Sequence, residues 1–529
     1  MDTTNLIMWS AVAPVPLLSA MTVLLLLSML LVLLVSSPTA ALRIGFVSTT
    51  LTVAMSVYML TIFDNDFAGI QLYENYQNFA FNYSVGVDGA NILFIPLTAI
   101  LTLLALIYTL TTRRSTDRIQ IACLLGYEAI LIGAFSSMNA MQFWIWCVLE
   151  LVPLVLITYR TGSGQNKRWV VALLMQHWGS GLLMVFAGFM LLAFSIMGPA
   201  DVLSFDWIML SENEKPLQYG TLIFFLLLFG FAIRMPLFPF HGWLPVLAEQ
   251  GSVASVGIFL VGLKLGVYAA IRFILPTVPE IAEEWTWFVL TLGLIGIFYG
   301  ALLALMQVNI RRLLAFAVIS HTGMLVIGIF DFNKYGMEGS ILLSIAYGLA
   351  TAGMLFSIGM IYKRTHTAYI SRLGGMYDVS AAIAILFVIS ALSTMVMPGT
   401  PGFDGAHLLI EGTIKGHGWL VSIAILIGNV LAAALLLRAF QQIFIASPKR
   451  FQGPFVYKTN TSTDPSPRNE RIIATVICSL LIGIGFHTSP WVDMIDQNVE
   501  HRRELHKIDY GTHYIDKDSM HLETKDYEK

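Results

Sequence analysis

Seven ionisable residues lie inside long apolar stretches of the sequence. Glu150 interrupts IWCVLELVPLV and Lys264 interrupts FLVGLKLGVYAA; the other five are Glu128, His177, Arg234, His321 and Glu411. Ionisable residues within a membrane are costly and commonly mark ion or proton pathways. Burial raises the pKa of a carboxyl group and lowers that of an ammonium group, and a nearby opposite charge reverses both effects. A buried Glu or Lys whose oppositely charged partner approaches and withdraws can therefore bind and release a proton. A series of such residues on neighbouring helices would form a proton relay.

These residues also have simpler interpretations. Glu128 could be a fixed hydrogen-bonding group, and His177 and His321 could be core histidines whose nitrogens are satisfied. Arg272 and Arg438 lie near the ends of apolar stretches, where long basic side chains can extend toward the aqueous interface. Glu150 and Lys264 lie well inside their stretches and are hardest to explain in this way. The seven residues are spread along the chain, so we expect a line across a membrane rather than a compact catalytic site.

Two apolar stretches are interrupted by proline and glycine. One runs into MPLFPFHGWLP, with Pro236 and Pro239, and the other runs into VMPGTPGFDGAH, with Pro398 and Pro401. Proline removes a backbone donor, and glycine loosens a helical turn. Because unwound backbone at membrane depth is tolerated where it lines a cavity, paired interruptions indicate broken helices beside an ion path. An ordinary proline kink is the alternative for each.

The amino-acid composition indicates whether these residues lie in a soluble protein or in a membrane protein. Of the 529 residues, 57% are apolar and 12% are charged, against about 45–50% and about 25% in soluble domains. A net charge of -3 offers no basic footprint for nucleic acid. The three cysteines lie in apolar runs, as expected of small buried residues. We therefore predict an all-α polytopic membrane protein.

A transmembrane helix needs about 20 mostly apolar residues, and this criterion predicts about fourteen spans. They lie near 16–36, 43–63, 89–111, 119–138, 140–159, 169–195, 219–238, 252–275, 285–306, 312–330, 339–362, 379–396, 418–445 and 471–489. The tightest assignment is the pair 119–138 and 140–159, which only a short turn separates.

Basic residues predict the orientation of the chain. With fourteen spans, the loops on one side carry seventeen Lys and Arg residues and those on the other side carry three. Loops rich in Lys and Arg remain in the cytoplasm. We expect a bacterial-type inner membrane protein with both termini on the outer, periplasmic side.

Several quoted segments together resemble the antiporter-like subunits of respiratory complex I, which are related to Mrp-type cation/proton antiporter subunits. The segments are FNYSVGVDGANILFIPLT (81–98), LELVP around Glu150, FPFHGWLP (238–245), NIRRLLAFAVISHTG (309–323), KRTHTAYISRLGG (363–375) and MPGTPGF (397–403). Within that group the chain is most similar to chain M. The match covers nearly all of the predicted bundle.

The resemblance implies two inverted five-helix repeats, each with a broken helix, and proton half-channels joined by a central polar axis. Glu150 matches the glutamate that modulates a lysine on span seven, Lys264 matches the central lysine of span eight, and His321 matches the histidine of span ten. It also implies that no cofactor resides in this chain, and that energy arrives through neighbouring membrane subunits.

Three positions depart from the family pattern. The span-seven lysine falls on Arg234, which stays protonated and is a sound counter-ion but a poor proton carrier. The ionisable residue of span twelve falls on Ala406, with Asp404, His407 and Glu411 nearby as candidate replacements. The span-eleven histidine falls on Tyr347, and the segment after HGWLP is one residue shorter.

These features divide the chain into six parts. Residues 1–118 hold the first three helices, 119–275 and 285–445 the two repeats, 446–470 a polar cytoplasmic loop, 471–489 the last span and 490–529 a polar tail. The tail is expected to be extended or bound along a partner.

The sequence leaves three functions open. The chain is a proton-translocating subunit of a complex I-type assembly, or the homologous subunit of another complex, or a structural subunit that no longer conducts. The second class includes bicarbonate- or CO2-accumulating complexes, membrane-bound hydrogenases and Mrp-type sodium/proton antiporters. The expected partners are other membrane subunits, lipid, and protons or sodium ions, with no nucleic acid. We find no metal-ligand cluster and no nucleophile arrangement in the sequence, so any enzyme class would belong to the complex.

Overall fold

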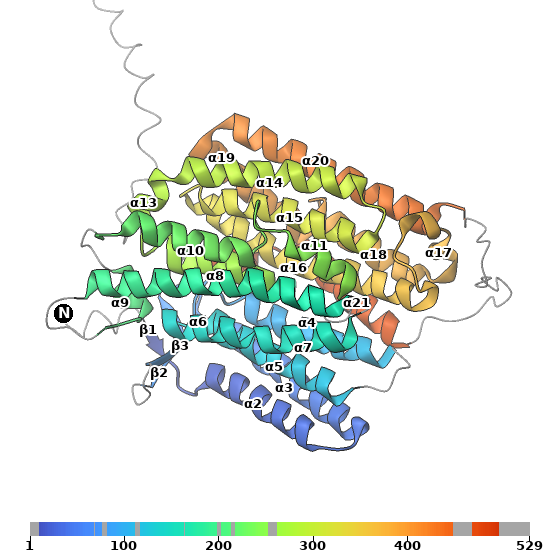
Figure 1. The fold of residues 1–529 in the computed structure, drawn as a ribbon, viewed down its shortest axis with the longest axis horizontal. Coiled ribbons are helices and arrows are strands. Elements are labelled where there is room, and N and C mark those ends of the chain that lie inside the picture. The colour runs from blue at the N-terminus through green and yellow to red at the C-terminus, as the bar shows by residue number, and fades with distance from the viewer. Residues whose placement is uncertain are drawn as a thin grey trace, which may run out of the picture.

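The computed structural model describes residues 10–67, 69–76, 82–111, 117–162, 164, 166–197, 203–212, 217–251, 262–447 and 468–496. In these residues the chain is a bundle of helices that run roughly parallel or antiparallel to one another (Figure 1). Helices prevail because apolar surroundings offer the backbone no other hydrogen-bond partners.

The N-terminal part combines membrane-length helices with a small sheet. Its elements are β1 (Ser10–Val12), α2 (Leu17–Leu34), α3 (Pro38–Ile62), β2 (Ile70–Tyr76), β3 (Tyr83–Val87) and α4 (Phe94–Thr111). Strand β2 pairs in parallel with β1 and antiparallel with β3. The Glu74 carboxylate on β2 accepts hydrogen bonds from the backbone amides of Leu18 and Ser19 at 2.8 and 3.2 Å. It thereby satisfies amides that the first turn of α2 would leave unpaired.

The next part of the chain contains the first broken helix. Its elements are α5 (Arg118–Ser136), α6 (Ala140–Leu149), α7 (Leu151–Thr161), α8 (Lys167–Ile196), α9 (Trp207–Ser211), α10 (Gly220–Arg234), α11 (Trp243–Gln250) and the π-helix η1 (Ala270–Ile274). Residues 262–269 are also helical and lead into η1. The short turn predicted between the fourth and fifth spans is confirmed between α5 and α6.

The last part contains the second broken helix. Its elements are α13 (Pro279–Glu284), α14 (Thr286–Met306), α15 (Ile310–Ile329), α16 (Lys334–Thr365), η2 (Ile370–Arg372), α17 (Met376–Val379), α18 (Ala381–Thr394), α19 (Pro401–His417), α20 (Trp419–Phe440), η3 (Gln441–Ile445) and α21 (Arg468–Phe486). Helices α15 and α16 are almost wholly buried within the protein.

Both interruptions predicted from proline and glycine are confirmed. Helix α10 ends at Arg234, before Pro236 and Pro239, and the chain resumes a helix only at Trp243. Helix α18 ends at Thr394, before Pro398, and α19 begins at Pro401.

In the described part of the chain, ten helices are long and apolar enough to cross a membrane. Three further apolar helices are shorter: Phe94–Leu110, Gly220–Arg234 and Ala381–Thr394. The predicted span at 252–275 begins in residues outside the described part. The structure is thus that of a multi-pass helical membrane protein, and the total of fourteen spans remains a prediction.

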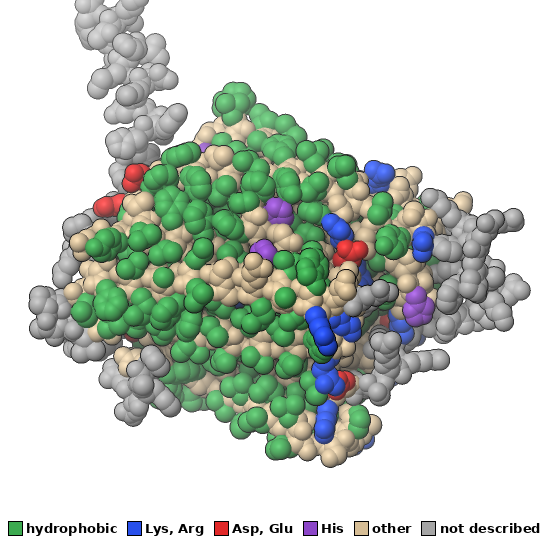
Figure 2. All heavy atoms as spheres, in the orientation of Figure 1, with side chains coloured by type: hydrophobic (Ala, Val, Ile, Leu, Met, Phe, Trp, Pro, Cys, Tyr) green, Lys and Arg blue, Asp and Glu red, His purple; other side chains and the backbone are tan. Residues whose placement is uncertain are grey.

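The two ends of the bundle differ in character. One end, here the strand end, carries β1–β3, α9 and α13 on the left of Figure 1. Figure 2 shows hydrophobic side chains over most of one lateral face, with Lys and Arg gathered toward the opposite end, here the basic end. Apolar residues on the lateral surface include Leu183, Trp287 and Val430, each more than 60% exposed. Such a surface is suited to lipid or to neighbouring membrane subunits.

The two predicted polar segments, the loop 446–470 and the tail 490–529, are described only in part. Most of the predicted loop 446–470 and of the tail 490–529 lies outside the described residues. The beginning of the tail is helical at residues 489–496 rather than extended, and binding of the tail along a partner stays a prediction. The backbone of Met494 and Ile495 packs directly against Gly89, and Ile495 is fully buried. This contact anchors the segment at the strand end.

Candidate functional site

Glu150 lies at the junction of α6 and α7, where it is completely buried. Its Oε1 atom accepts a hydrogen bond of 2.6 Å from the Tyr127 hydroxyl on α5. Its Oε2 atom is paired with the Arg234 guanidinium. A buried carboxylate needs such compensation for its lost hydration. The pairing of Glu150 with Arg234 that the sequence predicts is therefore confirmed.

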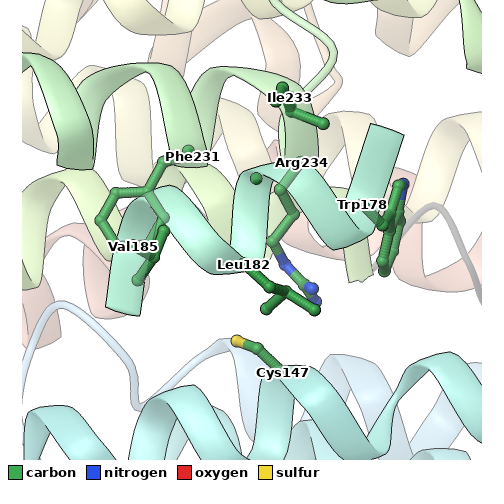
Figure 3. A pocket seen from close by; sticks show the side chains of 9 residues that line it. Cys147, Trp178, Leu182, Val185, Phe231, Ile233 and Arg234 are labelled. Carbon is green, nitrogen blue, oxygen red and sulfur yellow. The ribbon is translucent and has the colours of Figure 1, made fainter. Parts of the chain in front are cut away.

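Arg234 is the last residue of α10 and reaches this carboxylate because the helix ends there. Its guanidinium carbon lies 4.9 Å from the ring centroid of Trp178 on α8, within range of a cation–π interaction. A cavity of about 20 Å³ borders Arg234, Cys147 and Trp178. Figure 3 shows the Arg234 side chain extending from α10 toward Cys147 on α6. This volume accommodates about one water molecule, next to a fixed positive charge.

Lys264 belongs to the helical segment that crosses beside this pair. Two residues earlier, Gly262 packs so closely that a Cβ atom there would lie 2.8 Å from Glu150 Oε1 and would collide with the Tyr127 hydroxyl. The Lys264 side chain is 4% exposed, and no acidic side chain forms an ion pair with it in the described part of the chain. Its Nζ atom lies 5.7 Å from the ring centroid of Tyr347 on α16.

His321 on α15 stacks on the same tyrosine, Tyr347. The His321 and Tyr347 rings lie 4.3 Å apart at an interplanar angle of 16°. Neither ring nitrogen of His321 has a hydrogen-bond partner among the described residues, although the side chain is buried. His321 is thus a buried imidazole without a fixed hydrogen-bond partner in the described part of the chain.

These buried side chains are together termed here the polar axis. They form two groups, the Arg234–Glu150 pair and the group of Lys264, Tyr347 and His321, and Gly262 joins them by packing against Glu150. The polar axis draws on α10, the α6–α7 junction, the segment 262–269, α16 and α15. Arg234 is the last residue of α10, whereas Glu150 keeps helical backbone angles within the continuous span Ala140–Thr161.

A model of the NADH:quinone oxidoreductase/Mrp antiporter transmembrane family matches residues 137–432, which contain every residue of this axis. The chain belongs to this family. Subunit M of NADH-quinone oxidoreductase from Rickettsia conorii is 31% identical over 439 residues, which is 81% of this chain and 86% of that protein.

Solved structures agree on the fold. A chain of respiratory complex I from Thermus thermophilus superimposes with a TM-score of 0.82 at 23% identity, covering 92% of this chain and 99% of that one. A chain of the Mrp complex from Dietzia has a TM-score of 0.81 at 18% identity, covering 93% and 98%.

Four predicted relay residues of this antiporter-family chain lie apart from the polar axis. Glu128 on α5 is fully buried, and neither carboxyl oxygen has a hydrogen-bond partner among the described residues. Glu411 on α19 pairs with Lys415 at 2.8 Å, one turn away, with 38% of its side chain exposed. Asp404 accepts a hydrogen bond of 2.6 Å from Thr488. His407 is exposed, on the surface available to lipid or a partner.

The structure corrects the interpretation of Arg272, which does not extend toward the interface. It is completely buried in η1, where both terminal guanidinium nitrogens donate to the Asp88 carboxylate at 2.7 Å. Its Nε donates to Tyr268 at 2.9 Å. Asp88 lies in the quoted segment 81–98, but nothing in the local sequence identifies its distant partner. Arg438, by contrast, is exposed at the end of α20, as predicted.

Proposed function

We propose that this chain is a proton-translocating, antiporter-like membrane subunit of a complex I-type assembly. The single observation that carries the proposal is the buried polar axis, which keeps Lys264 and His321 close together without a permanent acidic partner. Family membership supports it, since the Rickettsia relative is named as a subunit of NADH-quinone oxidoreductase.

The chemistry of the axis follows from its charges. Arg234 remains protonated under all ordinary conditions, so it acts as a fixed counter-ion for Glu150 rather than as a proton carrier. Two cations repel strongly where the dielectric constant is low. Lys264 and His321 would therefore share one proton. Because Gly262 places the helix of Lys264 against Glu150, weakening of the Glu150–Arg234 pair would attract that proton toward Glu150, and its restoration would release it.

Substitution of Lys264 tests the proposal directly. In vesicles containing the complete assembly, Lys264→Ala is expected to abolish coupled proton transport while leaving assembly intact. Lys264→Arg is also expected to fail, since Arg keeps the charge but does not release the proton. Lys415→Ala, an exposed lysine on α19, serves as the control and should transport normally. Unchanged transport by Lys264→Ala would reject the relay.

The finer architecture belongs to the same proposal. We infer fourteen spans, with inverted five-helix repeats at 119–275 and 285–445. The supporting observation is that each proposed repeat contains one interrupted helix, α10/α11 and α18/α19. We further infer that the basic end faces the cytoplasm and that both termini lie on the periplasmic side of a bacterial-type inner membrane. A reporter inserted in 446–470 should be accessible only from the cytoplasm.

A second candidate is the corresponding subunit of a different complex. Arg234 and Ala406 favour it, because both depart from the family pattern at positions expected to titrate. Examples are a hydrogenase, an Mrp-type sodium/proton antiporter and an inorganic-carbon accumulating complex. The partners that co-purify with the chain would decide, and a sodium requirement for transport would favour the Mrp type. A structural subunit that no longer conducts predicts no effect of Lys264→Ala.

A further inference from the structure

A buried acid–base pair lies at the strand end, outside the polar axis. Asp331, in the loop between α15 and α16, has a side chain that is completely buried. His417, the last residue of α19, places Nε2 3.3 Å from Asp331 Oδ1 and 3.0 Å from the Phe330 carbonyl oxygen. The Thr413 hydroxyl donates to Asp331 Oδ2 at 2.8 Å. His417 is 16% exposed, so the pair links the interior to the outside.

Charged side chains near this pair in the sequence, on α16 and α19, interact with other residues, and Glu338 on α16 is hydrogen-bonded to Asp496. Lys334 pairs with Asp496, and Lys415 pairs with Glu411. His417 is therefore the titratable group that faces Asp331 from α19. Burial raises the pKa of Asp331 to about 8, and the Thr413 hydrogen bond lowers it only partly. Asp331 therefore holds and releases a proton near neutral pH.

A stripe of small and hydroxylated residues on α16 leads from the polar axis to Asp331. Tyr347, Ser344, Ser340 and Gly336 lie at helical spacings of three and four residues, which places them on one face of α16. The distance from Tyr347 to Gly336 along the helix is about 16 Å. Each of the four residues is buried.

Two residues of this stripe, Ser340 and Ser344, carry buried hydroxyl groups. The Ser344 hydroxyl is buried with no hydrogen-bond partner among the described residues. The Ser340 hydroxyl donates to the Leu325 carbonyl at 3.1 Å. At the far end, a Cβ atom on Gly336 would lie 2.6 Å from Asp331 Oδ2. The absence of a side chain at Gly336 therefore leaves the carboxyl in direct contact with the start of α16.

We propose that Asp331 and His417 form the proton-binding station at the strand end, connected to Lys264 and His321 along the Ser340–Ser344 face of α16. This inference rests on the proposed function, because it assigns the path by which protons pass between the axis and that side of the membrane. One proton moves from the axis to the Asp331 carboxylate. For release, His417 in the tautomer protonated at Nδ1 takes the Asp331 proton at Nε2 and gives its Nδ1 proton to water, and uptake runs in the reverse order. No other reactant is consumed.

The test measures proton transport by the complete assembly in vesicles as the pH on the strand-end side is varied. Asp331→Asn is expected to slow transport at least about tenfold and to remove an inflection near pH 8. Asp66→Asn makes the same change at an exposed residue of the same end and should leave rate and profile unaltered. His417→Gln keeps a donor for the Phe330 carbonyl but cannot carry a proton, so it should also slow transport.

A second pair of variants tests the connecting face. Ser344→Ala removes the unpartnered hydroxyl and should reduce transport several-fold. Ser357→Ala is the matched control on α16, since Ser357 is equally buried but donates to Ile383. If Asp331→Asn, His417→Gln and Ser344→Ala all transport normally while Lys264→Ala does not, the station is rejected and the proposed function stands. If Lys264→Ala transports normally as well, the proposed function itself fails.

Discussion

The Arg272 guanidinium donates two hydrogen bonds of 2.7 Å to the Asp88 carboxylate in a buried site. Residues 184 positions apart in the sequence thereby join the turn before α4 to η1. Since the Gly89 turn also contacts Met494 and Ile495, one small region ties three distant parts of the chain together at the strand end.

Breaking this pair should destabilise the protein strongly. Arg272→Ala removes the ion-pair partner of the buried Asp88 carboxylate, for which we expect a loss of about 3–5 kcal/mol. Thermal unfolding of the purified chain in detergent measures the effect. The double variant Arg272→Met with Asp88→Leu removes both charges and should recover much of the loss. Equal damage in single and double variants would contradict a charge-based explanation.

Variants of Arg234 separate charge from geometry. Arg234→Leu removes the counter-ion of Glu150, so we expect both lower stability and loss of transport. Arg234→Lys retains the positive charge and should keep the protein folded, although it loses the planar guanidinium group and its several donors. Transport rates of the assembled complex, compared at equal chain content, check both. Wild-type transport by Arg234→Leu would show that the pair with Glu150 is dispensable.

Gly262→Ala should impair transport by a steric mechanism. An added methyl group would collide with the Tyr127 hydroxyl and approach Glu150 Oε1 at 2.8 Å, which would force the helix of Lys264 away from the pair. Gly179→Ala on α8 meets no atom within 4 Å and provides the control. It should be neutral or slightly stabilising, by about 0.4–1 kcal/mol. Equal transport by the two variants would contradict a steric role for Gly262.

Glu411→Gln should be nearly silent. Its pair with Lys415 is exposed and contributes about 0.3–0.5 kcal/mol at most. Transport and melting temperature should both match the wild type. A large loss of transport would instead restore Glu411 as the replacement for the group missing at Ala406.

The pKa of Asp331 predicts a pH dependence of stability. The carboxyl titrates near pH 8 in the folded chain and has an ordinary value of 3.8. The folded state therefore binds the proton more tightly, and its stabilisation is complete below about pH 4 and is lost as the pH rises to about 8. Asp331→Asn should flatten this decline in thermal unfolding experiments. A decline of unchanged steepness would contradict the assigned pKa.

The sequence by itself determined the class of protein and several residues of the site. Composition and apolar length suffice for a helical membrane protein because lipid leaves the backbone few alternatives. An ionisable residue within an apolar run stands out locally, which is why Glu150, Lys264, Arg234 and His321 were found without a structure. Proline and glycine likewise predicted both helix interruptions.

Only the tertiary structure decided which of these residues meet. Pairing depends on helix rotation and on contacts between segments far apart in sequence, which local patterns do not encode. For that reason Glu150 joined Arg234 as expected, while Glu411 pairs with Lys415 one turn away and Asp404 bonds to the distant Thr488. Arg272, predicted to extend toward the interface, is buried because Asp88 and Tyr268 compensate its charge. Asp331 and His417 lie outside the apolar runs and met through the packing of α19 against the loop before α16.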